Sequence, residues 1–378
     1  MSAEISSHRS AGQRSAGSHP LASRIRQRAI AILEQAVADR VFPGAAFAVT
    51  RDSEILITGS TGRFTYEASS PEVLPETVFD LASVTKILAT TAMAMALCDR
   101  GKLDLKRKIT EVIPEFSDKG KDHRRLQITL RMLLAHSSGL PAYARLFEHA
   151  ASRNAMLRAI YNMPLETDPD TRAEYSDIGF ILLGEALSRI AGKPLNEFCQ
   201  REIFSKLELN NTLYLPPASW RSRIPPTVDD QRFRKRVIQG EVNDENASVL
   251  GGVAGHAGVF STTQDVSKFA LCILGYGQQL FGRETIRLFT TRQSIPVGTS
   301  RALGWDTPSA PSQSGQYFSQ KSCGHLGYTG TSLWIDTERK ISITLLTNRT
   351  WPHSDNQAIK QFRPKFHDAI MEELLKFQ

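Results

Sequence analysis

The sequence is poor in cysteine and lacks any long, uninterrupted apolar run. Its four cysteines, Cys98, Cys199, Cys272 and Cys323, lie far apart and without metal-ligand spacing. This argues against a disulfide framework and for free thiols in a reducing compartment. No apolar stretch approaches the roughly 18 residues that a membrane helix needs, and the N-terminus carries no apolar signal-peptide core. We therefore expect a cytoplasmic protein without a membrane span, or a periplasmic one if residue 1 is not the natural start.

The chain also lacks the charge pattern of a nucleic-acid-binding protein. It has 46 Lys and Arg against 39 Asp and Glu, a formal net charge of +7. The densest basic runs, at 106–108, 121–125 and 232–236, are not interleaved with aromatic residues or set in a nucleic-acid motif. We predict that these runs are solvated faces and that nucleic acid is not a partner. Because no metal-ligand spacing is visible, neither a metal nor a cofactor is expected.

What remains is an ordinary globular composition, with 41% hydrophobic and 22% charged residues among 378. This length suits one large domain or two closely packed ones. Residues 1–21 are mostly small and polar, and we expect them to be disordered. Residues 22–378 are predicted to form a single domain.

Strand-like runs occur in pairs near both ends of the chain, and each pair is joined by a short turn. The middle carries helical patterns instead. This order predicts an α/β (α+β) fold with a sheet lobe, about 22–82 and 266–378, and a helix-rich lobe, about 83–265. The Pro- and Ser-rich stretch 306–322 is expected to be an exposed loop. The predicted strands are 45–50, 54–58, 331–336 and 341–347, and the predicted helices include 22–39, 153–162, 177–191, 194–205 and 356–377.

A single Ser-x-x-Lys pair, Ser83 and Lys86, opens the apolar helical stretch 87–98. Near a helix start this spacing places the hydroxyl and the amine on one face, about 5–6 Å apart at Cβ. A serine becomes an effective nucleophile when an adjacent base takes its proton. The lysine must be neutral for this, so burial and nearby positive charge would have to lower its pKa. Taken alone, the pair is more simply explained as a capping serine followed by a solvated lysine.

Two later segments carry groups that such a pair can use. Tyr175 lies at the entrance of the helical run 178–190, where a rigidly held phenol beside a lysine can relay a proton. The alternative is a packed aromatic followed by an N-cap at Ser176 or Asp177. The segment 324–332 has three glycines ahead of a strand, and its free N–H groups could form one arm of an oxyanion hole.

In this order, Ser-x-x-Lys at 83–86, Tyr-x-Asp at 175–177 and His-x-Gly at 325–327 resemble the motifs of the serine β-lactamase and penicillin-binding protein superfamily. The likeness is nearest to the branch of class C β-lactamases, DD-peptidases and family VIII carboxylesterases. It covers about 25–375 and implies a β-lactamase/transpeptidase-like fold. In that fold an antiparallel sheet is flanked by helices, beside a helix-rich lobe, within one catalytic domain. Further stretches similar to this family are 42–45, 133–141, 204–209 and 258–262.

The resemblance implies a mechanism through an acyl-enzyme, without a cofactor. Ser83 would attack a carbonyl carbon, and Lys86, helped by Tyr175, would accept its proton. The N–H groups of Ser83 and Tyr328 would bind the oxyanion, and His325 would lie beside the lysine–tyrosine pair. The residues implied for oxyanion and substrate binding are Asp177, His325, Gly327, Tyr328 and Gly330.

Two positions depart from the family's motifs. Asp177 stands where the family has asparagine, and Leu326 where it has threonine. Unless Asp177 caps its helix and points away, its carboxylate would repel a carboxylate-bearing substrate and could hold Lys86 as a cation. Leu326 lacks the hydroxyl that helps to bind such a carboxylate. Both changes argue against efficient penicillin hydrolysis and favour an uncharged ester or amide, or a substrate with its own cation.

The expected function is therefore a serine hydrolase acting on a small-molecule ester, amide or β-lactam. A carboxylesterase is the first expectation, and a D-alanyl-D-alanine carboxypeptidase or a β-lactamase is the second. A catalytically silent binding protein of the same fold is the third, because the substitutions at Asp177 and Leu326 fall inside the motifs.

Two further segments leave alternatives open. The stretch 135–139 approximates the Gly-x-Ser-x-Gly nucleophile elbow around Ser137. The parallel sheet of an α/β-hydrolase is not apparent, so we interpret this stretch as a turn. The acidic run 243–246, followed by a Gly-rich bend ending at His256, could line a cleft or bind a metal. Loop packing is the simpler reading.

Overall fold

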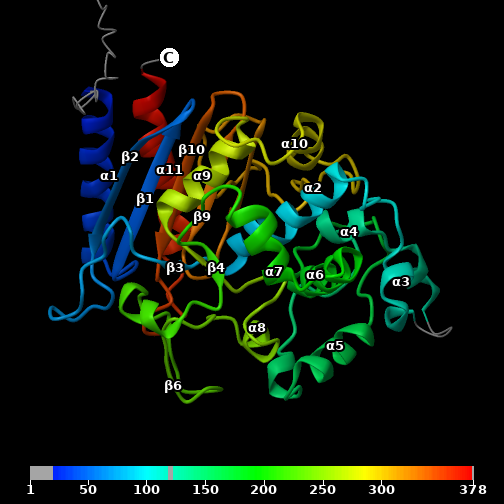
Figure 1. Ribbon diagram of the computed structural model, residues 1–378. Helices are drawn as coiled ribbons and strands as arrows, with labels where there is room; N and C mark the ends of the chain where they lie inside the picture. The colour runs from blue at the N-terminus through cyan, green and yellow to red at the C-terminus, as the bar shows by residue number, and fades with distance from the viewer. Residues whose placement is uncertain (1–19, 118–121, 377–378) are drawn as a thin grey trace, which may run out of the picture.

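A computed structural model describes residues 20–117 and 122–376 of the protein. Its centre is a five-stranded antiparallel sheet in the order β2-β1-β10-β9-β8 (Figure 1). Strand β1 pairs with β10, so that Phe47 lies opposite Leu345. The two ends of the chain therefore build one sheet, as predicted. The strands are β1 (Gly44–Arg51), β2 (Glu54–Gly62), β8 (Ser322–Leu326), β9 (Ser332–Asp336) and β10 (Ile341–Thr347).

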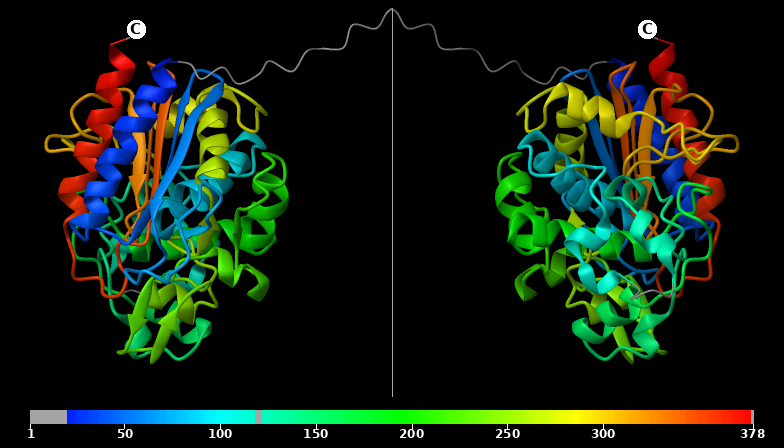
Figure 2. Two further views of the ribbon diagram at one scale, coloured as in Figure 1. Left: turned by 90° about the vertical axis from the view of Figure 1, so that its left-hand side faces the viewer. Right: turned by 90° about the vertical axis from the view of Figure 1, so that its right-hand side faces the viewer.

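Helices α1 (Pro20–Ala38) and α11 (Ile359–Leu375) lie side by side over one face of the sheet (Figure 2). The apolar side of α1 begins in its first turn, where Leu21 is only 3% exposed. The prediction of disorder through residue 21 is therefore wrong at Pro20 and Leu21, because burial of this leucine begins the helix there. Residues 1–19 lie outside the described part of the chain.

The opposite face of the sheet packs against α9 (Thr263–Ile273). Successive strand residues point to opposite faces. Phe47 thus joins the core beneath α1 and α11, whereas Ala46 joins a larger core shared with α2 (Ala92–Asp99) and α6 (Asp177–Ala191). The larger core spans both of the predicted lobes, whose boundaries stay a prediction.

The predicted helices of the middle segment are present, and this part of the chain also contains short strands. The helix at 194–205 is α7 (Leu195–Cys199) continued by a π-helical turn, Gln200–Phe204. The other helices are α3 (Ile109–Val112), α4 (Leu130–Leu134), α5 (Arg153–Tyr161), α8 (Glu245–Val249) and α10 (Arg283–Thr290). The short strands are β3 (Phe79–Asp80), β4 (Leu213–Tyr214), β5 (Val228–Asp230), β6 (Arg236–Ile238) and β7 (Val259–Ser261).

Two surface predictions need correction. The basic runs are not wholly solvated: Arg125 is 4% exposed and donates to the carbonyl of Phe116, and Arg234 pairs with Asp230 at 2.8 Å. A guanidinium has five donors and can enter the interior when carbonyls or carboxylates accept from them. The stretch 306–322 is a loop, but it is not exposed throughout, because Phe318 is buried against Trp334.

None of the helices within 20–117 and 122–376 is both long and apolar enough to cross a bilayer. The four cysteines are free thiols. Burial raises the pKa of the Cys98 thiol to about 12, which keeps it in the unreactive thiol form near neutral pH.

Candidate active site

Ser83 lies in a tight 3-10 turn, Ala82–Val84, that links β3 to a π-helix, Lys86–Thr91. Ala82 adopts a left-handed backbone with φ of 47°, which costs an L-residue about 1–2 kcal/mol. The buried carboxylate of Asp80 supports this turn by accepting the N–H of Ala82 at 2.8 Å. The strain and the buried support together point the Ser83 side chain toward the cleft, where it is partly exposed.

The ammonium of Lys86 is completely buried and has three hydrogen-bond acceptors. Its Nζ lies 3.0 Å from Ser83 Oγ, 2.6 Å from Asp177 Oδ1 and 3.1 Å from the carbonyl oxygen of His256. The three N–H bonds of an ammonium are thereby used. Burial lowers the pKa of Lys86, but the Asp177 carboxylate and Tyr175 outweigh it and leave the pKa raised. The lowered pKa that the base role requires is therefore not present at rest, and the group is a cation, the alternative that Asp177 had suggested.

Tyr175 is held immediately before α6. Ser176 caps this helix by accepting the N–H of Gly179 at 2.9 Å, so Asp177 is free to reach Lys86 instead of capping. The Lys86 ammonium lies 4.8 Å from the centroid of the Tyr175 ring. Burial raises the pKa of the Tyr175 hydroxyl, although Lys86 opposes this effect, and the resting side chain is a phenol.

The stretch 135–139 is a turn that supports Tyr175. His136 has a φ of 57°, its ring centroid lies 4.8 Å from that of Tyr175 in a tilted contact, and its Nδ1 accepts the Ser176 N–H at 3.0 Å. Ser137 is fully buried and donates to Asp170 at 2.5 Å. Since this hydroxyl faces a carboxylate in the interior and not the cleft, the rival nucleophile elbow is excluded.

The His-x-Gly segment, 325–327, and the loop that follows it pack against the Ser83 turn. Strand β8 ends at Leu326, and two threonines of the next loop donate to the chain just before Ser83: Thr329 to the Asp80 carbonyl and Thr331 to the Leu81 carbonyl, each at 2.8 Å. A Cβ on Gly327 would lie 1.9 Å from Thr331 Oγ1 and 2.4 Å from the Leu81 oxygen. The glycine therefore permits the close approach.

Tyr328 stands at the tip of this loop with its side chain 54% exposed. Its carbonyl accepts from Arg349 Nε at 2.7 Å, whereas its N–H has no acceptor among the residues that the structure describes. Gly330 completes the loop with a φ of 103°, a conformation that glycine adopts without strain.

His325 is buried beside the lysine–tyrosine pair, with its ring centroid 5.9 Å from that of Tyr175. Burial and the charge of Lys86 hold its pKa well below the usual value, so the ring is neutral. Its Nδ1 donates to the Leu326 carbonyl at 2.8 Å. The remaining Nε2 is then an acceptor, and it has no partner within the described ranges.

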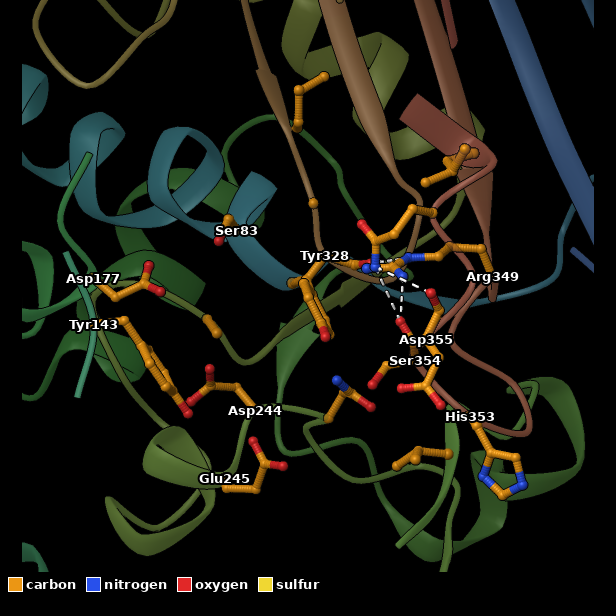
Figure 3. A pocket seen from close by; sticks show the side chains of 18 of the residues that line it. Ser83, Tyr143, Asp177, Asp244, Glu245, Tyr328, Arg349, His353, Ser354 and Asp355 are labelled. Carbon is orange, nitrogen blue, oxygen red and sulfur yellow. Dashed lines mark hydrogen bonds between the residues drawn. The ribbon is translucent and has the colours of Figure 1, made fainter. Parts of the chain in front are cut away.

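A cavity of about 1100 Å³ joins these groups. Of the predicted residues, Ser83, Tyr175 and Asp177 line it together with the segment from His325 to Tyr328. Gly330 does not line it, and Lys86 lies behind its wall. Figure 3 shows Asp177 with Tyr143, Asp244 and Glu245 along one side, facing Tyr328, Arg349 and His353 on the other.

Sequence reasoning missed several groups of this site. Arg301 lines the cleft with its guanidinium carbon 5.4 Å from the Tyr175 ring centroid. Asp80 lies just ahead of the Ser-x-x-Lys pair, and burial raises the pKa of this carboxyl to about 6. No local sequence pattern marks Arg301. Asp80, however, stands two residues before the Ser83 turn, a position from which a carboxylate can accept a backbone N–H of the turn.

The acidic run at 243–246 lines the cleft through Asn243, Asp244 and Glu245. His256, from the Gly-rich bend, lies behind this wall and contacts Asp244. Among the described residues, no group of three or more His, Cys, Asp and Glu side chains is arranged to hold a metal ion.

Comparison with known proteins places this geometry in a family. Residues 29–364 match the model of the beta-lactamase family. The chain is 33% identical to an N-acetylmuramyl-L-alanine amidase of Bacillus subtilis (strain 168), over 82% of this chain and 77% of that protein. It is 34% identical to a putative D-alanyl-D-alanine carboxypeptidase of Escherichia coli (strain K12), over 74% and 70% of the two chains.

Solved structures share the fold at lower sequence identity. EstCE1, a hydrolase with promiscuous acyltransferase activity, aligns with a TM-score of 0.75 and 19% identity over 93% of this chain and 99% of its own. A class C beta-lactamase from Rhodobacter sphaeroides aligns with a TM-score of 0.72 and 18% identity over 92% and 99%. The fold is thus β-lactamase/transpeptidase-like, and the chain belongs to the beta-lactamase family.

Proposed function

We propose that this protein is a serine hydrolase that forms an acyl-enzyme at Ser83 and acts on ester carbonyls as a carboxylesterase. One observation carries the proposal: Lys86 Nζ lies 3.0 Å from Ser83 Oγ and 2.6 Å from Asp177 Oδ1, behind a cleft that Ser83 lines. A hydroxyl, a base and a group that orients the base form the minimal arrangement of an activated nucleophile.

The resting charges determine how the proton leaves Ser83. Since Lys86 rests as an ammonium, acylation proceeds from the form in which Lys86 has lost one proton to solvent. The neutral amine then takes the Ser83 proton as Oγ attacks the carbonyl carbon. The Tyr175 phenol donates to the departing alkoxide and recovers a proton from Lys86. Water attacks the acyl group by the same steps in reverse order.

The developing oxyanion needs two donors. The N–H groups of Ser83 and Tyr328 serve this role, and Thr329 and Thr331 tie their two segments together. Removing one such donor in comparable sites costs about 3–4 kcal/mol of transition-state stabilisation. The unpartnered N–H of Tyr328 supports this assignment.

Substrate charge supports an ester over a penicillin. Asp177 lines the cleft with a carboxylate, and Leu326 presents no hydroxyl there. An anionic substrate group next to Asp177 would be repelled, whereas an uncharged ester, or an acyl group with its own cation, would not.

A second candidate is hydrolysis of amide bonds in carboxylate-bearing peptides or β-lactams. The observation that favours it is Arg301, which lines the cleft and is only loosely paired with Asp306 at 3.5 Å. A guanidinium in this position is suited to bind a substrate carboxylate. The names of the amidase and the putative carboxypeptidase, each about a third identical to this chain over the aligned residues, point the same way.

The test compares wild type with Ser83→Ala on p-nitrophenyl butyrate, a D-amino-acid peptide and a penicillin. We expect ester turnover by wild type, background turnover by Ser83→Ala, and an acyl adduct on the Ser83 peptide by mass spectrometry. Ser137→Ala is the matched control, because that hydroxyl is the rival nucleophile, and it should retain turnover. Ester hydrolysis that survives in Ser83→Ala would refute the assignment, and peptide turnover without ester turnover would favour the second candidate.

A further inference from the structure

We propose that Asp244 and His256 form a positioning pair for the base: their contact at the cleft wall fixes the His256 carbonyl, which holds Lys86 within reach of Ser83. This inference rests on the proposed function. It assigns a role to the acidic run at 243–246 and to the Gly-rich bend that ends at His256.

The first step is the placement of the ammonium. Lys86 Nζ ends a flexible four-carbon chain, and three acceptors at 2.6–3.1 Å, together with the nearby Tyr175 hydroxyl, define its position. One of them, Ser83 Oγ, loses its proton in the proposed reaction, and another, Asp177 Oδ1, attracts the ammonium by its charge. The His256 carbonyl is a neutral acceptor that takes no part in the proton transfer. Without it, Nζ would be drawn toward the anionic Asp177 and away from the neutral hydroxyl.

The second step is the fixing of that carbonyl. The preceding bend contains Gly251 and Gly252, both with positive φ, and Gly255. Glycine permits this bend, and Thr90 Oγ1 already holds the neighbouring Gly255 carbonyl at 2.6 Å. The His256 ring supplies an anchor, because it is 1% exposed and its Nε2 lies 2.9 Å from Asp244 Oδ1. A carboxylate is acceptor-only, so Nε2 donates the proton.

The third step connects this anchor to the nucleophile. Asp244 is itself held as the N-cap of α8, where it accepts the Ala247 N–H at 2.7 Å. The preceding N–H, of Asn243, donates to Asp80 Oδ2 at 2.6 Å, while Asp80 Oδ1 accepts the N–H of Ala82. Residues 243–244 therefore contact both the turn that carries Ser83 and the residue that fixes Lys86.

The result is a closed ring of contacts from the Ser83 turn through Asp80, residues 243–244 and His256 back to Lys86. Such a ring sets the distance between hydroxyl and amine, which chemistry at Ser83 requires. Figure 3 places Asp244 on the cleft wall below Ser83, consistent with a support on the substrate side of the pair. A purely structural contact would predict lower stability but unchanged turnover by the folded enzyme.

The experiment compares His256→Leu, which removes the donor at similar bulk, with His256→Gln, whose amide can donate to Asp244 in its place. For p-nitrophenyl butyrate, the Leu variant should lose about 10- to 100-fold in kcat with KM little changed. The Gln variant should recover most of that loss. His149→Leu is the control, because His149 is exposed and outside the cleft, and it should behave as wild type. The rate of Ser83 labelling by a fluorophosphonate should fall in parallel with kcat.

Several outcomes would overturn the inference. Leu and Gln variants with equal kcat would show that the donor is irrelevant, and a change confined to KM or to thermal stability would indicate a structural role. If His256→Leu does not fold, Asp244→Asn provides the second test, since it keeps an oxygen acceptor but weakens the bond, and kcat should fall by a smaller factor. A wild-type protein without hydrolase activity would refute both the proposed function and this inference. An active wild type together with a His256→Leu variant of unchanged kcat would refute the inference alone.

Discussion

At the scale of single residues, one carboxylate decides the charge state of the base. By its position at a helix start, Asp177 could be the N-cap of α6, but Ser176 is the residue that caps this helix. The Asp177 side chain is thereby free to approach Lys86 to 2.6 Å. A buried lysine next to an anion stays protonated, whereas the same lysine next to an amide loses its proton more easily.

Replacing the anion with the family's amide should move the pH dependence of the reaction. In wild type, the Asp177 carboxylate raises the pKa of Lys86 and opposes the lowering effect of burial. Asp177→Asn removes this charge, so the pKa of Lys86 should fall. The base works unprotonated, so activity rises as pH passes its pKa. A lower pKa therefore shifts the rising limb of the kcat/KM profile to lower pH.

The measurement is p-nitrophenyl butyrate hydrolysis as a function of pH for wild type and Asp177→Asn. Asp170→Asn is the control, because Asp170 pairs with Arg131 and Ser137 away from the cleft. A rising limb that stays in place, or that moves to higher pH in Asp177→Asn, would contradict the assignment of this limb to Lys86.

Local spacing reveals some of these residues and not others. Ser83 and Lys86 are visible because three residues of separation on a helical turn bring side chains together. The contact of Lys86 with the His256 carbonyl joins residues that are far apart in sequence, and no periodicity predicts such a backbone acceptor. The sequence offered the raised pKa of Lys86 only as one of two alternatives, since it depends on where the Asp177 side chain points.

At the scale of elements, the cleft depends on a strand end that meets a tight turn. The hairpin strands and the terminal helices follow from apolar alternation and helical periodicity, which are local signals. The tie between the end of β8 and the Ser83 turn is not local, because it consists of threonine hydroxyls that donate to carbonyls of a distant segment. The glycines in 324–330 indicated that this backbone lies close to another group, but they did not indicate that the group is the Ser83 turn.

This tie predicts the effect of one added methyl group. In Gly327→Ala, the new Cβ meets Thr331 Oγ1 at 1.9 Å and the Leu81 carbonyl at 2.4 Å, so the loop must move away from the Ser83 turn. Overpacking of this kind costs typically about 1–3 kcal/mol of stability. Displacement of the Tyr328 N–H should lower kcat by up to about 100-fold.

Urea unfolding and ester turnover measure the two effects of Gly327→Ala. Gly179→Ala in α6 is the matched control, because its Cβ would meet nothing closer than 3.4 Å. An alanine inside a helix should leave that protein as stable as wild type or more stable by up to about 1 kcal/mol. A Gly327→Ala enzyme with wild-type kcat would show that this loop does not supply the oxyanion donor.

At the scale of the whole molecule, the two chain ends and the middle share one interior. The larger hydrophobic core contains sheet residues such as Ala46 and Leu333 together with helical residues such as Leu88 and Leu183. The second core lies between the sheet and the terminal helices and includes Phe47 and Trp334. Since residues of the sheet and of the helix-rich segment fill the same larger core, neither lobe can close this core without the other.

A shared interior predicts that the two lobes unfold together. Trp305 lies in the larger core and Trp334 in the second, and both are fully buried. Two variants, each keeping one of these residues and carrying Phe at the other three tryptophan positions, report on each core separately. In each variant the urea midpoint from tryptophan fluorescence should coincide with that from far-UV circular dichroism, as required of one cooperative transition.

Because burial of both sheet faces couples the cores, neither fluorescence signal should change at a lower urea concentration than the circular dichroism signal of the helices. A Trp334 transition at a different urea concentration from that of the helices would show that the sheet lobe folds on its own. The chain would then have to be divided near residues 83 and 265 into two units.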